Sequence, residues 1–114
     1  MSDKELFIRF SGDVTADKIT NLFNSIDNAL ANDIIKTIRI GISSKGGDIS
    51  AAINGYHQLQ HYKKRCKLIT YNTGCVDSAA TILFLAADER YCLKYTSFLI
   101  HSVRVLSTWY DDGL

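Results

Sequence analysis

The sequence predicts an α/β domain whose sheet is mainly parallel. Segments rich in β-branched and aromatic residues alternate with segments whose apolar residues recur every three or four positions, and this alternation is typical of strand–helix–strand units. Short glycine turns follow two of the expected strands, as Gly46-Gly47 and as Gly74. In such sheets, functional sites form where strand ends turn into helices. The 114 residues, of which 46% are hydrophobic and 22% charged, suit one ordinary globular domain.

The first half of the chain is expected to hold two strands and two helices. A strand over residues 5–10 precedes an amphipathic helix for which Thr15 is the expected N-cap. A second strand over 34–42 leads through a glycine turn into a second helix over 49–65, whose apolar residues again form one stripe. Gly55 lies inside this helix, where glycine is unfavourable, and is expected to mark close packing.

The second half is expected to hold three strands and one helix. An apolar run over 66–71 predicts a buried strand, and Gly74 is expected to form the turn that follows it. Residues 78–87 are apolar almost all round, which is typical of a buried helix. Two further short strands are expected over 91–94 and 97–101.

Ser78 is the first candidate for chemistry, because it is expected on the first turn of the buried helix. Free backbone N–H groups and the positive end of the helix dipole converge at such a place. A serine there could attack a carbonyl group, and the resulting oxyanion could be held by those N–H groups. The ordinary alternative is that Ser78 is a helix N-cap.

A serine nucleophile needs a base within hydrogen-bond reach, and the chain has three histidines. His101 ends a very apolar strand and would therefore lie at a strand mouth, although a structural histidine is the alternative. His57 and His61 lie one turn apart on the second helix. A metal site there would need a third ligand that the sequence does not indicate, so a solvated helix face is favoured. No metal and no cofactor is expected.

The Gly46-Gly47 turn has three interpretations. A phosphate-binding loop is one, but the longer glycine fingerprints and their lysine are missing. A turn that presents backbone N–H groups to an oxyanion is another. The third is a plain turn without a function.

Bulk properties exclude several classes of partner. The net charge of +1 gives no general attraction to nucleic acid or membranes, and the short basic cluster Lys63-Lys64-Arg65 is expected to be a solvated helix end. No apolar run is long enough to cross a bilayer, and the N-terminal sequence is not that of a signal peptide. The three cysteines are odd in number and lack metal-type spacing, which favours reduced thiols in a cytoplasmic protein.

Taken in order, these motifs resemble the proteolytic subunit of the Clp protease family. The ordered set is Ser44-Lys45-Gly46-Gly47, then Gly74-x-x-x-Ser78-Ala79-Ala80, then Leu99-Ile100-His101. The resemblance covers about Leu6 to His101, which is nearly the whole chain. It implies the ClpP/crotonase-like fold, a spiral of ββα units with a mainly parallel sheet.

The resemblance also implies a function. Ser78 would be the nucleophile and His101 the general base of a serine-type endopeptidase that works through an acyl-enzyme. The backbone N–H groups of Gly47 and Ala79 would form the oxyanion hole. Peptides or unfolded proteins would be the substrates, the chain would form a homo-oligomer in the cytoplasm, and an ATP-dependent unfoldase would be a candidate partner.

The sequence departs from the family pattern at several positions. Lys45 stands where the family has proline, and Asp77 stands where it favours a small residue. The third catalytic residue of the family, an aspartate, has no counterpart, since Asp111 and Asp112 do not match its position. Residues 1–114 are therefore expected to form a single domain that lacks the C-terminal part of the family, hydrolyses peptides slowly or not at all, and assembles into an oligomer smaller than the family's double ring.

Two other functions remain open at this point. A catalytically inactive subunit or fragment with a scaffolding role would keep the fold without the chemistry. An acyl-CoA enzyme of the crotonase type would use similar glycine-turn oxyanion holes. The pairing of Ser78 with His101 argues against the latter, because crotonases stabilise an enolate and need no serine nucleophile.

Overall fold

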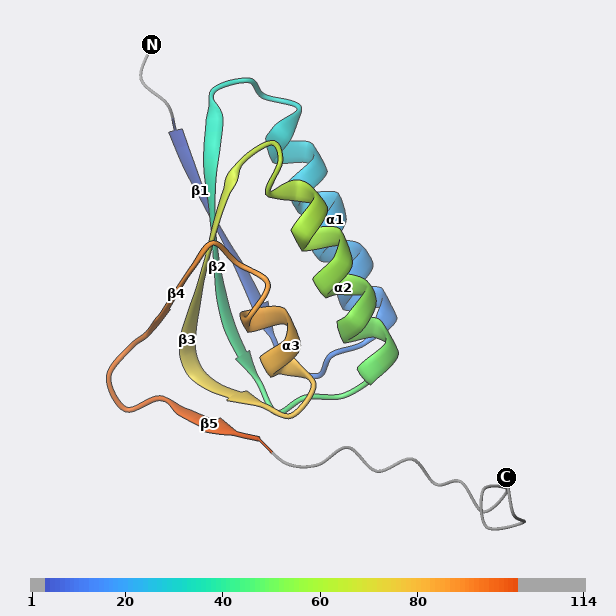
Figure 1. Ribbon diagram of the computed structural model, residues 1–114, viewed down its shortest axis with the longest axis vertical. Coiled ribbons are helices and arrows are strands. Elements are labelled where there is room, and N and C mark those ends of the chain that lie inside the picture. Colours follow the sequence, from blue (N-terminus) through green and yellow to red (C-terminus); the bar gives the residue numbers. More distant parts are fainter. Residues whose placement is uncertain (1–3, 101–114) are drawn as a thin grey trace, which may run out of the picture.

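The computed structural model describes residues 4–100 and shows one parallel sheet with its helices on one face (Figure 1). The strands are β1 (Lys4–Ser11), β2 (Ile35–Ser44), β3 (Lys67–Asp77), β4 (Glu89–Cys92) and β5 (Ser97–Leu99), and the helices are α1 (Ala16–Leu30), α2 (Ile49–Tyr62) and α3 (Ala80–Phe84). Every strand pair in this part of the chain is parallel. The expected α/β fold with a mainly parallel sheet is confirmed.

The strand order makes β3 the centre of the sheet. The order is β1-β2-β3-β4, and β5 also pairs with β3. The first half of β3 pairs with β4, from Ile69 opposite Glu89, and its second half pairs with β5, up to Asp77 opposite Leu99. The two short strands therefore lie one after the other along the same edge of β3, and Figure 1 shows β3 bending between them.

Local signals set the starts of the first two helices. The Thr15 side chain accepts a hydrogen bond from the Lys18 amide at 3.2 Å, so the predicted N-cap of α1 is confirmed. Asp48 caps α2 in the same way and accepts a hydrogen bond from the Ala51 amide at 3.0 Å. These caps fix where the chain leaves the turns at the carboxyl ends of β1 and β2.

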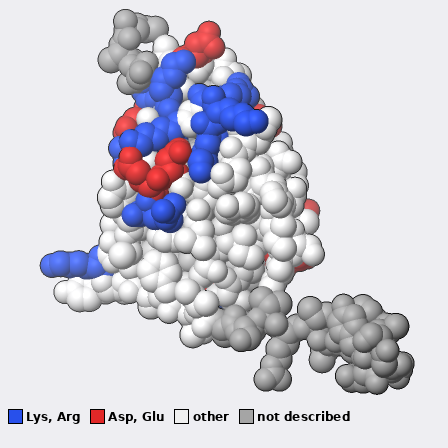
Figure 2. Space-filling view, in the orientation of Figure 1, with Lys and Arg blue, Asp and Glu red and all other residues white. Residues whose placement is uncertain are grey.

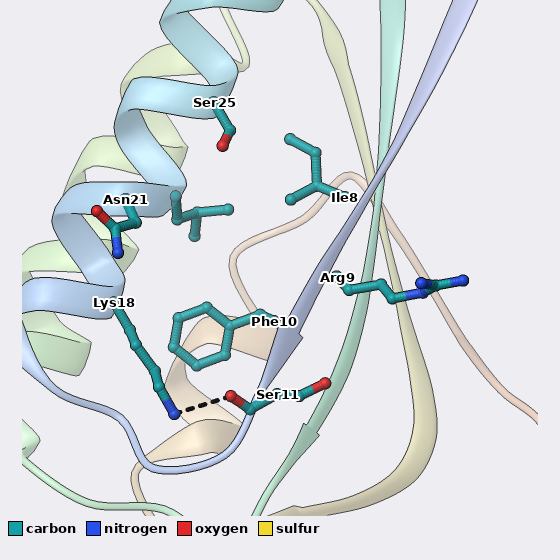
Figure 3. A pocket seen from close by; sticks show the side chains of 8 residues that line it. Ile8, Arg9, Phe10, Ser11, Lys18, Asn21 and Ser25 are labelled. Carbon is teal, nitrogen blue, oxygen red and sulfur yellow. Dashed lines mark hydrogen bonds between the residues drawn. The ribbon is translucent and has the colours of Figure 1, made fainter.

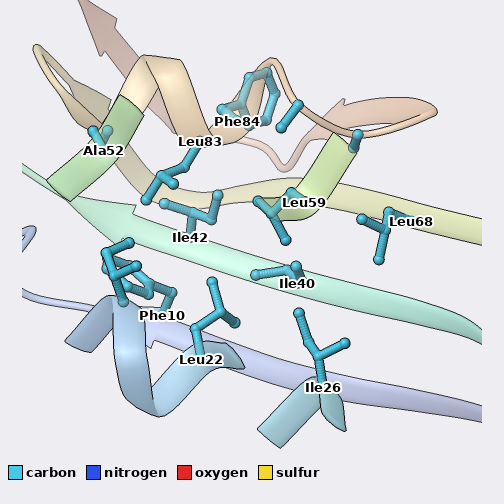
Figure 4. Packing of buried hydrophobic residues seen from close by; sticks show 14 of the residues in the cluster. Phe10, Leu22, Ile26, Ile40, Ile42, Ala52, Leu59, Leu68, Leu83 and Phe84 are labelled. Atoms are coloured by element: carbon cyan, nitrogen blue, oxygen red, sulfur yellow. The ribbon is translucent and has the colours of Figure 1, made fainter. Parts of the chain in front are cut away.

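The core lies between the sheet and the helices (Figure 4). Ile40 and Ile42 of β2 are about 1% exposed and face Leu22 of α1 and Leu59 of α2. Gly55 of α2 lets α1 and α3 pack close to α2, because a Cβ added there would lie 2.5 Å from Leu83 Cδ2 and 3.0 Å from Ile19 Cδ1. The close packing expected at this glycine is confirmed.

No helix of the described residues covers the opposite face of the sheet, which carries aromatic and paired charged side chains. Arg39 of β2 forms two hydrogen bonds of 3.0 Å with the Glu5 carboxylate and one with the Tyr71 hydroxyl. The rings of Tyr71 and Tyr91 stack with centroids 5.6 Å apart. Figure 2 shows most of the visible charged side chains gathered at the end of the molecule where β1 begins and α2 ends.

Two sequence predictions around β3 are wrong. The strand predicted over 66–71 continues to Asp77, and Gly74 lies inside it instead of forming a turn. At Gly74 an added Cβ would lie 2.5 Å from Ser43 Oγ, so glycine allows the two strands to approach closely. The register between β2 and β3 shifts at this point, and the Asn72 side chain accepts a hydrogen bond from the Gly74 amide at 3.1 Å.

The last helix and the strand after it also differ from expectation. The helix predicted over 78–87 is limited to Ala80–Phe84. It cannot begin at Ser78, because the backbone φ of 53° at that residue fits no α-helix. The chain then makes a tight turn, and β4 begins at Glu89, two residues before the predicted strand. β5 forms as expected over its described part, whereas residues 101–114 lie outside the described residues.

Candidate functional site

The glycine turn after β2 is held by backbone hydrogen bonds to the segment after β1. The Val14 amide donates to the Gly46 carbonyl oxygen at 2.9 Å, and the Asp48 amide donates to the Val14 carbonyl oxygen at 2.8 Å. Gly46 and Gly47 have φ values of 107° and 150°, which favour glycine. A Cβ on Gly47 would lie 2.4 Å from the Val14 carbonyl oxygen. The turn is therefore anchored even though Lys45 replaces the proline that the family resemblance leads one to expect.

Ser78 lies on a sharp turn between a strand and a helix. β3 ends at Asp77, and the Ser78 amide donates to the Leu99 carbonyl oxygen of β5 at 2.8 Å. The Ser78 carbonyl oxygen accepts hydrogen bonds from the amide and the hydroxyl of Thr81, at 3.0 and 2.6 Å. With its φ of 53°, Ser78 is in a left-handed conformation that is uncommon outside glycine. Both sides of the turn thus hold it in a strained conformation.

The interpretation of Ser78 as a helix N-cap is wrong. Ala79 occupies the N-cap position of α3, and in this described segment no side-chain hydrogen bond caps the helix. Ser78 precedes that position and is half-buried. The expectation that Ser78 would lie on the first helical turn is corrected in the same way, because the left-handed backbone places it before the helix.

The two glycine-containing regions meet at Ser78. A Cβ added to Gly46 would lie 2.8 Å from Ser78 Cβ and 3.3 Å from the Ala79 amide nitrogen. Gly46 therefore packs directly against the serine, and only glycine leaves the space. Within residues 4–100, the amides of Gly47 and Ala79 donate no hydrogen bond. Two available N–H donors are thus found at or next to the contact between the glycine turn and Ser78.

His101 lies outside the described residues, so its position relative to Ser78 is a prediction. The described chain that leads to it is β5, which pairs with β3 in register from Cys75 opposite Ser97 to Asp77 opposite Leu99. The strand before His101 and the strand before Ser78 are therefore neighbours and point in the same direction.

Asp77 was noted in the sequence only as a departure from the family pattern, and the structure gives it an unusual environment. Its Oδ1 atom is buried and has no hydrogen-bond partner among the described residues. Val14 and Leu99, which hold the two turns through their backbone carbonyl groups, were not anticipated at all. Their side chains carry no signal of this role, because the contacts join residues that are far apart in the chain.

The other residues considered in the sequence lie away from Ser78. His57 and His61 are exposed on α2, as expected. Within residues 4–100, no three His, Cys, Asp or Glu side chains are grouped so as to hold a metal ion. The helices of this part of the chain are all too short or too polar to cross a membrane.

A pocket of about 220 Å³ lies at the open edge of β1 (Figure 3). Ile8 and Phe10 of β1 line it together with Leu22 of α1, and the Lys18 ammonium group donates to the Ser11 carbonyl oxygen at 3.0 Å. None of the residues that line it belongs to the glycine turn or to the turn at Ser78. The candidate site is therefore the contact between these two turns.

Comparison with known sequences identifies relatives of this chain. A family model described as Clp protease matches residues 2–108. The ATP-dependent Clp protease proteolytic subunit 2 of Borreliella burgdorferi is 35% identical over 101 residues, which are 86% of this chain and 50% of that protein. The ATP-dependent Clp protease proteolytic subunit of Bdellovibrio bacteriovorus is 31% identical over 99 residues, 75% of this chain and 46% of that protein. The chain spans about half the length of these curated relatives.

Comparison with solved structures shows the same fold. ClpP1 from Listeria monocytogenes matches with a TM-score of 0.77 at 20% identity, over 93% of this chain and 64% of that chain. A mutant of the 1510-N membrane-bound stomatin-specific protease in complex with a substrate peptide matches with a TM-score of 0.78 at 22% identity, over 93% of this chain and 48% of that chain. The expected ClpP-like fold is confirmed.

Proposed function

The chain belongs to the Clp protease family, and we propose that it acts as a serine-type endopeptidase. Ser78 is the proposed nucleophile, His101 the proposed general base, and the N–H groups of Gly47 and Ala79 the proposed oxyanion hole. One observation carries the proposal: Ser78 is held in a left-handed conformation between β3 and α3, with Gly46 packed against it.

In this mechanism the Ser78 hydroxyl oxygen attacks the carbonyl carbon of the scissile peptide bond while His101 takes up the hydroxyl proton. The negative charge that develops on the carbonyl oxygen is stabilised by the two N–H groups. His101 then returns the proton to the departing amine, which leaves an ester on Ser78. Water, activated by the same base, hydrolyses this ester and frees the enzyme.

The local structure supports each part that lies within the described residues. A left-handed residue between a strand and a helix projects its side chain away from both elements, as in the sharp turns that carry other serine nucleophiles. Gly46 has no side chain that could fill the space beside Ser78. The Gly47 and Ala79 amides donate no hydrogen bond within residues 4–100, so they remain available to a ligand.

The proposal extends to assembly and partners. We propose that the chain self-associates, because Phe7, Tyr91 and Leu93 are about half exposed on or beside the sheet face that no described helix covers. The relatives are named as subunits of an ATP-dependent protease, so peptides or unfolded proteins are the proposed substrates and an ATP-dependent unfoldase the proposed partner. The free Cys66, Cys75 and Cys92 support a reducing, cytoplasmic location.

The test is covalent labelling of the full chain with a fluorophosphonate, followed by mass spectrometry of the labelled peptide. We expect the label on Ser78 and none after Ser78→Ala, because the reagent reacts only with an activated serine. Ser43→Ala is the control, since Ser43 is half-buried near the site but is not the proposed nucleophile. Labelling that persists in Ser78→Ala, or no labelling of the unchanged chain, would contradict the proposal.

A scaffolding subunit without activity is the second candidate. The Asp77 carboxylate favours it, because a negative charge beside Ser78 would oppose formation of an oxyanion. Light scattering on the same sample separates the two functions. An assembled chain that takes up no label would support the scaffold, and a labelled chain would support the peptidase.

A further inference from the structure

Asp77 precedes Ser78 directly, and its carboxyl group forms no ion pair with the described residues. Its Oδ1 atom is buried without a hydrogen-bond partner among the described residues. The ion pairs in this part of the chain join Arg39 to Glu5 and Lys67 to Glu89, and neither involves Asp77. Burying a carboxylate oxygen without a donor is unfavourable. A donor from outside the described chain would relieve that cost.

The carboxylate lies on the side of the sheet that the helices leave open. Side chains alternate between the two faces of a strand. Val76 is fully buried, and the ring of its register partner Phe98 lies 5.2 Å from the ring of Phe84 in α3, so these two face the helices. Asp77 and its partner Leu99 therefore face the other side. Asp77 as a whole residue is half-buried, and a ligand that approaches it from this side displaces no helix.

Asp77 is also next to the groups proposed for the chemistry. Its carbonyl oxygen lies 3.0 Å from the position that a Cβ on Gly46 would take, and Ser78 follows it in the chain. A peptide whose scissile bond lies at Ser78 therefore lies close to the backbone of Asp77.

Lys45 is the basic residue of the glycine turn that packs against Ser78. Ser44, the last residue of β2, is the register partner of Val76, so Lys45 follows the end of β2 while Asp77 is the last residue of β3. Lys45 is nevertheless exposed, and no ion pair joins it to Asp77 within residues 4–100. Lys45 therefore does not pair with the Asp77 carboxylate among the described residues.

We propose that Asp77 binds a cationic side chain of the peptide substrate, arginine or lysine, next to the scissile bond. The proposal rests on the proposed function, because it takes Ser78 as the point of attack. Arginine fits better than lysine, since its planar guanidinium donates two parallel hydrogen bonds to a carboxylate. A neutral side chain leaves the buried oxygen unpaired, so Asp77 selects among substrates by charge.

The first experiment measures how fast peptidyl phosphonates label Ser78 in the full chain. The reagents carry arginine, lysine, leucine or citrulline beside the reactive phosphorus, and citrulline is the neutral analogue of arginine. We expect the arginine reagent to react about 10–100 times faster than the citrulline reagent, the range for one charge-assisted hydrogen bond. Asp77→Asn should remove this preference by slowing the arginine and lysine reagents relative to the leucine and citrulline reagents, whose rates should rise because a charge that opposes the oxyanion is gone. Asp77→Glu should keep part of the preference.

Two results of this experiment would overturn the proposal. One is an equal fall of all four rates in Asp77→Asn, which would mean that Asp77 positions the catalytic groups and does not select the substrate. The other is the absence of any preference for the cationic reagents in the unchanged chain. Lys45→Ala serves as the control for charge, and it should keep or strengthen the preference for arginine.

A second experiment does not depend on the reaction. Binding of benzamidine, a small aromatic cation, is followed by NMR in the unchanged chain, in Asp77→Asn and in Asp77→Glu. Saturable binding that is lost only in Asp77→Asn supports the cation site even if no phosphonate labels Ser78, in which case the proposed peptidase fails alone. Labelling of Ser78 without charge preference and without benzamidine binding overturns the cation site and leaves the peptidase standing.

Discussion

The two ends of the sheet are built in opposite ways. Where the strands begin, charged side chains find partners, as in the pairs of Arg39 with Glu5 and of Lys67 with Glu89. Where β2 and β3 end, the backbone is left-handed at Gly46 and at Ser78, and polar groups lack partners among the described residues. At the first end, the charged side chains named above are paired with one another within the chain. The second holds strain and unpaired groups, which a bound substrate can relieve.

The largest effect on stability is expected from Gly46→Ala at the carboxyl end. The new Cβ would lie 2.8 Å from Ser78 Cβ, and the φ of 107° disfavours any side chain. Labelling of Ser78 should slow by about 10²–10³-fold, as when an oxyanion donor is lost. The free energy of unfolding should fall by about 2–4 kcal/mol. Phosphonate kinetics and urea unfolding measure the two effects.

Gly41→Ala is the matched control in the middle of the same sheet. Its new Cβ would lie 2.8 Å from Phe7 Cζ, but that atom is the end of a side chain that is about half exposed and can move. We expect a loss of about 1 kcal/mol in stability and no change in labelling. Equal slowing of labelling in Gly46→Ala and Gly41→Ala would contradict the idea that the reaction depends on the glycine turn at the carboxyl end.

A smaller effect on stability, of opposite sign, is expected from Ser78→Gly. Glycine adopts the φ of 53° without the steric cost that serine bears. The variant should lose all labelling and gain about 1 kcal/mol in the free energy of unfolding, since relief of the strain outweighs the added chain entropy. Thermal and urea unfolding measure this gain.

Tyr95→Gly separates strain at the site from strain elsewhere. Tyr95 has a φ of 65° in the turn between β4 and β5 and is 98% exposed. The Tyr95→Gly variant should gain stability to a similar degree as Ser78→Gly and should keep the labelling of Ser78. A loss of stability in Ser78→Gly, alongside a gain in Tyr95→Gly, would contradict the idea that the site stores strain.

The smallest effect is expected at the amino end, from Glu5→Gln and Glu89→Gln. Hydrogen bonds from Arg39 lower the pKa of the Glu5 carboxyl, and hydrogen bonds from Lys67 and Tyr91 lower that of Glu89. Because these pKa values are lower in the folded than in the unfolded chain, the ion pairs add stability above the unfolded value of about 4.3 and lose it as the pH falls through the folded values.

The double variant should therefore show a weaker dependence of the melting temperature on pH in the acidic range, and unchanged labelling at neutral pH. The effect is small because these groups are exposed to solvent. A change in the labelling rate would mean that the two ends of the sheet are coupled.

The order of strands and helices could be predicted because its signals are local. The capping residue Thr15 acts on an amide three residues along the chain, and Gly55 could be singled out because glycine is unfavourable inside a helix, although the side chains it packs against come from α1 and α3. The continuation of β3 through Gly74 could not be predicted in this way. It depends on Ser43 of the neighbouring strand and on a register shift that no short stretch of sequence encodes.

The candidate site was predicted in part. The sequence indicated that the glycine turn and Ser78 belong together, and Gly46 does lie against Ser78 and the Ala79 amide. The left-handed backbone of Ser78 was missed, because it results from hydrogen bonds to Leu99 and Thr81 on both sides. The unpaired oxygen of Asp77 was missed as well, since burial of a single atom follows from packing and not from residue type.

The hydrogen bond from the Ser78 amide to the Leu99 carbonyl oxygen joins the proposed nucleophile to β5. β5 has three residues, and all of them are exposed. If β5 leaves the edge of β3, Ser78 loses one of the restraints that hold it left-handed. The turn at Ser78 is then strained while β5 is docked on β3 and relaxed when β5 is undocked. A molecule that binds one form of β5 more tightly therefore also shifts the turn at Ser78 toward the corresponding form. The size of the shift is set by the ratio of its affinities for the two forms.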